Sequence, residues 1–137
     1  SLIQTAPLTG AVVVTTPSDV SLEDARKAVN MFEQVRVPIL GIVENMAYLN
    51  CPHCHERIDV FSYGGGRRTA ERMNVHFLAE VPMGPDVRIG GDTGKPVATR
   101  SDSDPWAAVF VEMAKNLIER ANQERHKSQG PAITIED

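Results

Sequence analysis

Two short apolar runs, separated by an amphipathic segment, dominate the first third of this 137-residue chain. The runs are Gly10–Thr16 and Ile39–Val43, and both are rich in β-branched residues without polar alternation. Such runs are typical of parallel strands that are covered on both faces. A helical pattern begins at Ser21, with Asp24 at the capping-box position. Its apolar residues are Leu22, Ala25, Val29, Phe32 and Val35. The sequence therefore predicts a strand–helix–strand unit with a right-handed crossover.

The middle of the chain predicts shorter elements between long polar or glycine-rich segments. After the polar stretch Asn50–Gly66, the pattern indicates a short helix at Arg67–Met73 and a strand at His76–Val81. The next stretch, Pro82–Pro96, is rich in glycine and proline and predicts a loop of functional length. These segments continue the alternation of strands and helices.

A last helix begins at Asp104-Pro105, with proline in its first turn. Its apolar face consists of Trp106, Val109, Phe110, Met113, Leu117 and Ile118. The pattern fades after residue 121, so we expect residues 122–137 to form a polar, frayed tail. Residues 1–121 would form part of an α/β domain with a doubly wound, mostly parallel sheet. The chain has no starting Met and only a short lead-in, so we expect the N-terminal portion of that sheet to be missing.

Composition and charge argue against several classes of partner. The chain is 42% hydrophobic and 23% charged, as is usual for a globular domain, and its formal net charge is -4. No block of Lys and Arg offers a surface for nucleic acid or for an anionic membrane. No apolar run is long enough to span a membrane, and the first residues do not form a signal peptide. We therefore expect a cytoplasmic protein.

Cys51 and Cys54 are the only cysteines and lie three positions apart, in the sequence C-P-H-C. Two thiolates at this spacing can chelate a soft metal or close a disulfide. In a reducing compartment, a metal or redox site is favoured over a structural disulfide. A tetrahedral zinc site or an iron–sulfur cluster usually has four protein ligands, so this pair supplies half of a thiolate site.

Three kinds of site can use such a pair. A single-chain zinc site would need two of His53, His55 and His76, but His53 lies between the cysteines and His55 follows Cys54 directly. A thioredoxin-like oxidoreductase would need a long helix after the motif, whereas residues 55–63 are mixed and end at three glycines. A second copy of the chain would supply the missing pair and place four thiolates around one metal centre on a two-fold axis.

Two glycine-rich segments imitate a phosphate loop without matching one. Before Gly94–Lys95, Ile89 stands where the first glycine of a Walker A loop belongs, and Pro96 replaces the hydroxyl residue that holds magnesium. Gly64–Gly66 has no lysine and predicts a tight turn into a helix. Asn45 is a different candidate, because it follows a buried strand where open α/β sheets place ligands, although asparagine also commonly ends strands.

Several motifs occur in a fixed order. They are P-L-T-G-A-V-V-V-T-T-P-S-D-V-S-L-E-D-A-R-K-A-V, G-I-V-E-N-M, C-P-H-C, F-S-Y-G-G-G-R-R-T-A-E-R and V-P-M-G-P-D-V-R-I-G-G-D-T-G-K-P-V. Together, from Leu2 to Leu117, they resemble the C-terminal half of the Mrp/ApbC family of iron–sulfur cluster carriers. These carriers are P-loop ATPases of the nitrogenase-iron-protein and MinD class.

The resemblance implies a cofactor and a partner. In this family, the C-x-x-C pairs of two subunits hold a bridging [4Fe-4S] cluster that passes to apo-proteins, so Cys51 and Cys54 would be its ligands in a homodimer. The asparagine of the N-M motif faces adenine, which assigns Asn45 to nucleotide binding. The segment from Pro82 to Asp86 would form one side of the pocket for the same base.

The resemblance also implies what this chain lacks. The family's lysine-containing phosphate loop and magnesium-binding segments precede the part that matches, so we expect ATP, Mg²⁺ and ATP hydrolysis to belong to a longer parent protein. Where the family often has an acidic residue, this chain has Gly84, which removes a side-chain contact with the base. A MinD-like regulatory ATPase with a structural zinc loop is the alternative, but the last helix is mixed on its second face and lacks the basic character of a membrane-targeting helix.

Overall fold

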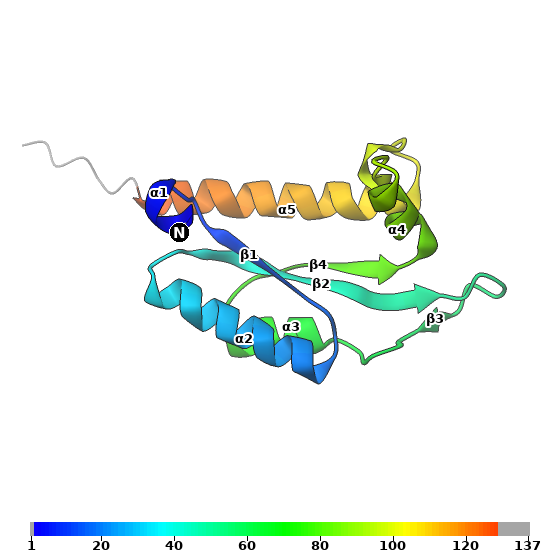
Figure 1. Cartoon of the computed structure of the whole chain (residues 1–137), viewed down its shortest axis with the longest axis horizontal. Helices are drawn as coiled ribbons and strands as arrows, with labels where there is room; N and C mark the ends of the chain where they lie inside the picture. Colours follow the sequence, from blue (N-terminus) through cyan, green and yellow to red (C-terminus); the bar gives the residue numbers. More distant parts are fainter. Residues whose placement is uncertain (1, 129–137) are drawn as a thin grey trace, which may run out of the picture.

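The structure, a computed structural model, describes residues 2–128 of the chain. Its sheet contains three parallel strands, which are β1 (Ala11–Thr15), β2 (Ile39–Asn50) and β4 (Phe77–Met83). β2 lies between the other two, and a two-residue strand, β3 (Arg57–Ile58), pairs antiparallel with its carboxyl end (Figure 1). The predicted α/β class with a mostly parallel sheet is confirmed.

Helices cover both faces of this sheet (Figure 1). One face carries α2 (Asp19–Gln34) and α3 (Gly65–Arg72), and the other carries α5 (Pro105–Ser128). The shorter elements are α1 (Leu2–Thr5), α4 (Pro85–Asp92) and the 3-10 turn η1 (Val97–Thr99). Because β1, β2 and β4 are parallel, their carboxyl ends meet at one edge of the sheet, where the candidate site residues lie.

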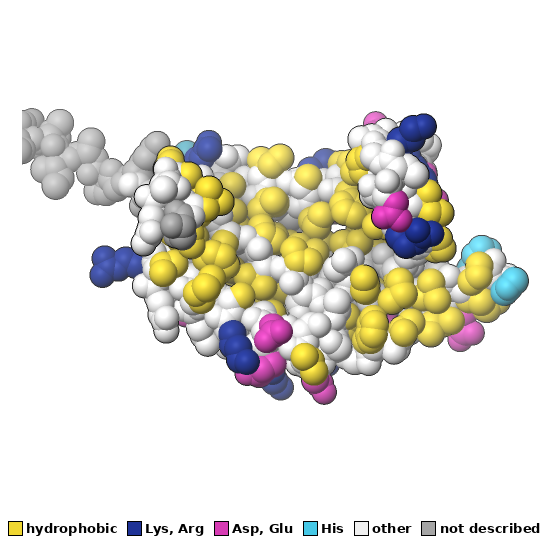
Figure 2. Space-filling view, viewed as in Figure 1, with side chains coloured by type: hydrophobic (Ala, Val, Ile, Leu, Met, Phe, Trp, Pro, Cys, Tyr) yellow, Lys and Arg dark blue, Asp and Glu magenta, His cyan; other side chains and the backbone are white. Residues whose placement is uncertain are grey.

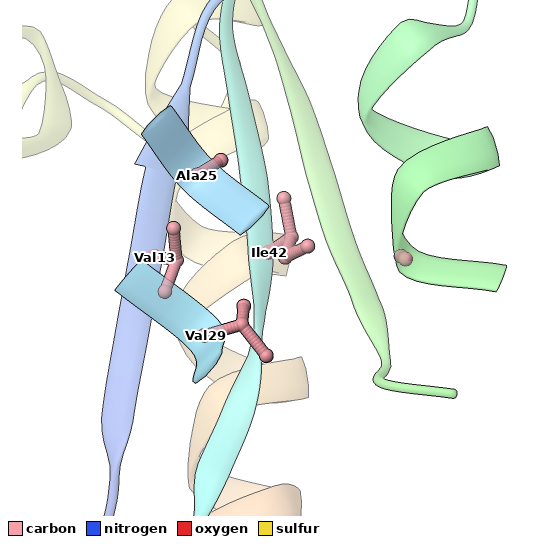
Figure 3. Packing of buried hydrophobic residues seen from close by; sticks show 5 residues of the cluster. Val13, Ala25, Val29 and Ile42 are labelled. Atoms are coloured by element: carbon pink, nitrogen blue, oxygen red, sulfur yellow. The ribbon is translucent and has the colours of Figure 1, made fainter. Parts of the chain in front are cut away.

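Two apolar clusters explain why the strands read as uninterrupted apolar runs. Val13 of β1 and Ile42 of β2 pack with Ala25 and Val29 of α2 (Figure 3), and Ala70 of α3 completes this cluster. The opposite face is covered by α5, beneath which lie Val43, Leu78 and Val81. Neighbouring residues of β2 therefore enter different cores, because side chains alternate across a strand.

The predicted start of α2 was wrong. Ser18 is the N-cap, and its hydroxyl oxygen accepts a hydrogen bond from the backbone N–H of Ser21 (3.4 Å). The helix therefore begins at Asp19, and the capping box that the sequence predicted with Asp24 does not form. Asp24 instead makes an exposed ion pair with Lys27 (3.9 Å).

The structure also corrects the predicted lengths of three segments. The predicted loop Pro82–Pro96 contains α4, whose two glycines and initial proline hide its helical pattern in the sequence. β2 continues past Val43 to Asn50, because its last residues pair with β3. α5 continues through residues 122–128, where the positive charges of basic residues in its last turn interact favourably with the helix dipole. The rest of the predicted tail, 129–137, lies outside the described residues.

No helix in the described part of the chain is long and apolar enough to cross a membrane.

Candidate metal-binding hairpin and nucleotide pocket

Cys51 and Cys54 lie in the tight turn that joins β2 to β3. The backbone N–H of Cys51 donates a hydrogen bond to the carbonyl of Glu56 (2.9 Å), and the Cys51 carbonyl accepts one from the N–H of His55 (2.9 Å). His55 has a left-handed φ of 62°, which lets the chain reverse. Both thiols are free, and Cys51 is half-buried whereas Cys54 is exposed. The structure therefore brings the predicted pair together at the tip of one hairpin.

The turn favours the ionised form of Cys51. The pKa of Cys51 is lowered, mainly by the backbone N–H of Cys54, then by that of His53 and then by the Cys54 thiol. A lowered pKa increases the thiolate fraction at neutral pH, and the thiolate is the form that binds metals. Hydrogen bonds to a metal-bound sulfur also stabilise its negative charge. The pair thus has the chemistry that soft-metal ligation requires.

The hairpin lacks the remaining ligands of a four-coordinate centre. Within residues 2–128, no group of three or more His, Cys, Asp and Glu side chains is placed to hold a metal ion. His76 lies just before β4, at the other edge of the sheet, and contacts Arg120 instead. The chain also enters β3 after the cysteines, where a thioredoxin-like site would have a helix. The hairpin projects from the body with histidines at its end (Figure 2), so a second protein can reach it.

A cavity of about 690 Å³ opens at the carboxyl ends of β2 and β4. Its lining residues are Asn45, Met46, Leu49, Pro82, Met83, Gly84, Pro85, Val87 and Arg88. Two of the three predicted nucleotide residues, Asn45 and Pro82, therefore share one pocket. The side-chain oxygen of Asn45 accepts a hydrogen bond from the Met46 N–H (3.0 Å), which leaves the amide N–H donors and the second lone pair of that oxygen to meet a ligand.

Asp86, the third predicted nucleotide residue, is placed differently. It is not among the residues that line the cavity, and its carboxylate accepts a hydrogen bond from Arg100 (2.7 Å). Arg100 also approaches Asp104 (3.4 Å), which caps α5 through the N–H of Trp106. A Cβ atom on Gly84 would overlap the ring of Trp106, so no side chain fits where the family often has an acidic residue. Asp86 thus links α4 through Arg100 to the cap of α5 by exposed ion pairs.

Glu44 is a buried carboxylate that the sequence analysis did not single out. It lies on β2 beside Asn45, and one carboxylate oxygen accepts a hydrogen bond from the N–H of Gly66 in the first turn of α3. Gly64 has a left-handed φ of 68°, and Gly66 approaches Glu44 so closely that a Cβ would lie 2.7 Å from its oxygen. The three glycines therefore serve the turn into a helix, as predicted, and a protein carboxylate takes the place at this helix end that a phosphate would need.

A family model of known proteins matches this chain over residues 1–118, and it describes the NUBPL iron-transfer P-loop NTPases of the ParA group. The chain belongs to this family. Two relatives illustrate it: the iron–sulfur cluster transfer protein NUBPL of Dictyostelium discoideum is 42% identical over 139 residues, and the iron–sulfur cluster carrier protein of Pyrococcus furiosus is 42% identical over 123 residues. The alignment with the Dictyostelium protein covers 98% of this chain and 43% of that relative. The alignment with the Pyrococcus protein covers 90% of this chain and 41% of that relative.

Solved structures support the same fold. A nucleotide-binding protein of Archaeoglobus fulgidus in complex with ADP is 38% identical, with a TM-score of 0.60 over 69% of this chain and 39% of that protein. The cell division ATPase MinD of Pyrococcus furiosus is 24% identical, with a TM-score of 0.60 over 81% and 43%, and shows the fold alone. The resemblance to a family of iron–sulfur cluster carriers is confirmed, and the chain spans about two fifths of the length of the relatives that it matches.

Proposed function

We propose that this chain is part of an iron–sulfur cluster carrier in which Cys51 and Cys54 of two copies hold one [4Fe-4S] cluster. The observation that carries the proposal is the half-site: one surface hairpin presents two free thiols, and no third ligand joins them within the described residues. Thiolates are soft ligands suited to iron–sulfur clusters, and four of them complete such a centre. A homodimer provides this number without any change in the hairpin. The cluster is then cargo, and apo iron–sulfur proteins receive it.

The cavity at the carboxyl ends of β2 and β4 is proposed to take the adenine of ATP. Asn45 supplies a polar group, and the backbone after Pro82 supplies a wall, in a pocket that is otherwise largely apolar. Such pockets bind flat bases at the carboxyl edge of an open α/β sheet. In this proposal, the phosphates, Mg²⁺ and ATP hydrolysis depend on a phosphate loop that belongs to a longer parent protein. A cytoplasmic location belongs to the same proposal.

Anaerobic addition of ferrous iron and sulfide to the native protein tests the carrier function. The wild-type protein should develop the broad visible absorbance of a cluster, and Cys51→Ser or Cys54→Ser should abolish it. His53→Ala is the matched control, because it changes the same turn without removing a thiol. A wild-type protein that binds zinc in this hairpin and forms no cluster would contradict the proposal and favour the MinD-like alternative.

A further inference from the structure

The cysteine hairpin has little backbone pairing to hold it on the sheet. β3 is two residues long, and the pairs with β2 are Leu49 with Ile58 and Asn50 with Arg57. Arg57 therefore lies opposite the residue that immediately precedes Cys51. Two ladder pairs at the end of a strand give a short antiparallel ribbon little stability of its own. Side-chain contacts must add to this pairing if the two thiols are to keep a fixed position.

Arg57 supplies such contacts to four side chains. Its Nε donates a hydrogen bond to Asp59 (2.8 Å), and its Nη1 approaches a carboxylate oxygen of Glu80 (3.4 Å). The guanidinium also lies 4.0 Å from the centre of the Tyr48 ring and 5.0 Å from that of Tyr63. The side chain of Arg57 is 35% exposed, so solvent weakens each of these contacts, and their effect depends on their number.

These partners belong to separate parts of the fold. Tyr48 is on β2, Glu80 is on β4, and Tyr63 lies in the segment that leads into α3. Arg57 thus joins the hairpin to β4 and to the approach to α3, and its contact with Tyr48 adds to the β2–β3 pairing. A planar guanidinium can pair with carboxylates at its edge and stack on rings with its faces, whereas a lysine ammonium cannot do both.

Glu80 gives the charge of Arg57 a second role. Glu80 is in register with Glu44 on the neighbouring strand, and Glu44 is fully buried. Two carboxylates side by side on adjacent strands repel each other, and a cation over one of them reduces this cost. Removing the charge of Arg57 should therefore increase the repulsion between Glu80 and Glu44, whereas Arg57→Lys keeps the charge and removes only the stacking and the fork.

The geometry points to Arg57 as a positioning residue that holds the cysteine hairpin in a fixed place on the sheet and thereby slows the loss of the metal group from Cys51 and Cys54. The slower loss of the metal group rests on the proposed function. The fixed position of the hairpin concerns the metal-free protein alone.

The test compares Arg57→Gln and Arg57→Lys with Arg67→Gln in the native protein. Arg67 is the matched control, because it is an arginine of α3 whose guanidinium lies 4.5 Å from the centre of the Phe77 ring, at the amino end of β4. Amide hydrogen exchange of residues 50–58 is measured without metal, by mass spectrometry. Release of Co²⁺ and of reconstituted iron to a chelator is measured in parallel, from the decay of thiolate-to-metal absorbance.

Arg57→Gln should raise hairpin exchange and both release rates about tenfold, in line with the loss of two partly exposed ion pairs and two ring contacts. Arg57→Lys should restore part of this loss, and Arg67→Gln should match the wild type. Unchanged hairpin exchange in Arg57→Gln would overturn the inference, and so would equal effects of Arg57→Gln and Arg67→Gln. Faster amide exchange of the hairpin with unchanged metal release would overturn the inferred effect of Arg57 on retention of the metal group. A wild-type protein without a cluster would contradict the proposed function, while exchange and Co²⁺ release would still decide the role of Arg57.

Discussion

Glu44 is a buried carboxyl group that both holds the start of α3 through a hydrogen bond and has a perturbed pKa. The side chain has no exposed surface, and within the described residues only one of its oxygens has a hydrogen-bond partner, the N–H of Gly66. Burial raises the pKa of Glu44, and nearby Glu80 raises it further, whereas the Gly66 N–H and the charges of Arg68 and Arg57 oppose the shift. A carboxylate kept in such a place costs stability when it is ionised.

Glu44→Gln and Glu44→Ala separate this charge from the hydrogen bond. Because the folded-state pKa is raised above the ordinary 4.5, folding favours the protonated form, and stability is lost as the pH rises through the raised pKa. The free energy of unfolding of Glu44→Gln should therefore increase relative to that of the wild type between about pH 5 and about pH 8. Glu44→Ala also leaves Gly66 without an acceptor, so its unfolding free energy should lie about 1–3 kcal/mol below that of Glu44→Gln at both pH values. Denaturant titrations measure both, and a constant offset for Glu44→Gln would contradict the raised pKa.

His76 provides a pH effect of the opposite sign. Burial lowers the pKa of His76, and the positive charges of Arg120 and Lys127 lower it further. Folding therefore favours the neutral ring, whose contribution to stability is complete above pH 6.5 and is lost as the pH falls through the lowered pKa. His76→Asn should flatten this acid-side loss in denaturant titrations. Arg120→Gln should raise the His76 pKa measured by NMR, and an unchanged value would show that the contact does not act on the imidazole.

At the scale of elements, the sequence predicted those that carry a strong period. β1, α2 and α5 have uninterrupted or regularly spaced apolar residues, so their presence could be predicted from local pattern. α4 was missed because Gly90 and Gly91 lower helix propensity, and Gly90 is needed where a Cβ would lie 2.8 Å from the Lys95 carbonyl in the turn that follows the helix. Arg57 was missed for a similar reason, since its partners on β2, β4 and the approach to α3 are brought together only by the fold. The cysteine pair was predictable because its signal is local.

Two glycine substitutions test how closely α3 is fitted to β2. In Gly66→Ala, the new Cβ would lie 2.7 Å from a Glu44 oxygen and 3.0 Å from the Glu44 Cβ, so the variant should lose roughly 1–3 kcal/mol. In Gly91→Ala on α4, nothing lies within 4 Å of the new atom. This matched control should gain about 0.5–1 kcal/mol, because alanine is the better helix former. Thermal denaturation gives both signs, and equal effects would contradict the close approach of α3.

At the scale of the whole molecule, β1 leaves one side of the sheet open. Within the described residues it pairs with β2 alone, and Val14 is 63% exposed. An unpaired apolar edge favours association with other chains. The isolated 137-residue chain should therefore self-associate in light scattering after size exclusion, and Val14→Lys should reduce this, whereas Val20→Lys on the exposed face of α2 should not.

Nucleotide should not stabilise this chain in isolation. Stabilisation by a ligand grows with its concentration relative to the dissociation constant, and contacts with adenine alone are too few for tight binding. A melting scan with and without Mg-ATP should therefore give the same midpoint. An upward shift would show a phosphate site that neither the sequence nor the described residues contain.

The shared cluster is tested most directly by counting iron, sulfide and protein chains in one particle. Native mass spectrometry of the reconstituted protein under anaerobic conditions makes this count. The half-site at Cys51 and Cys54 predicts a dimer with about four irons and about four sulfides, and Cys51→Ser should give a particle without them. A monomer that carries one zinc and no sulfide, or a complete cluster on a single chain, would contradict it.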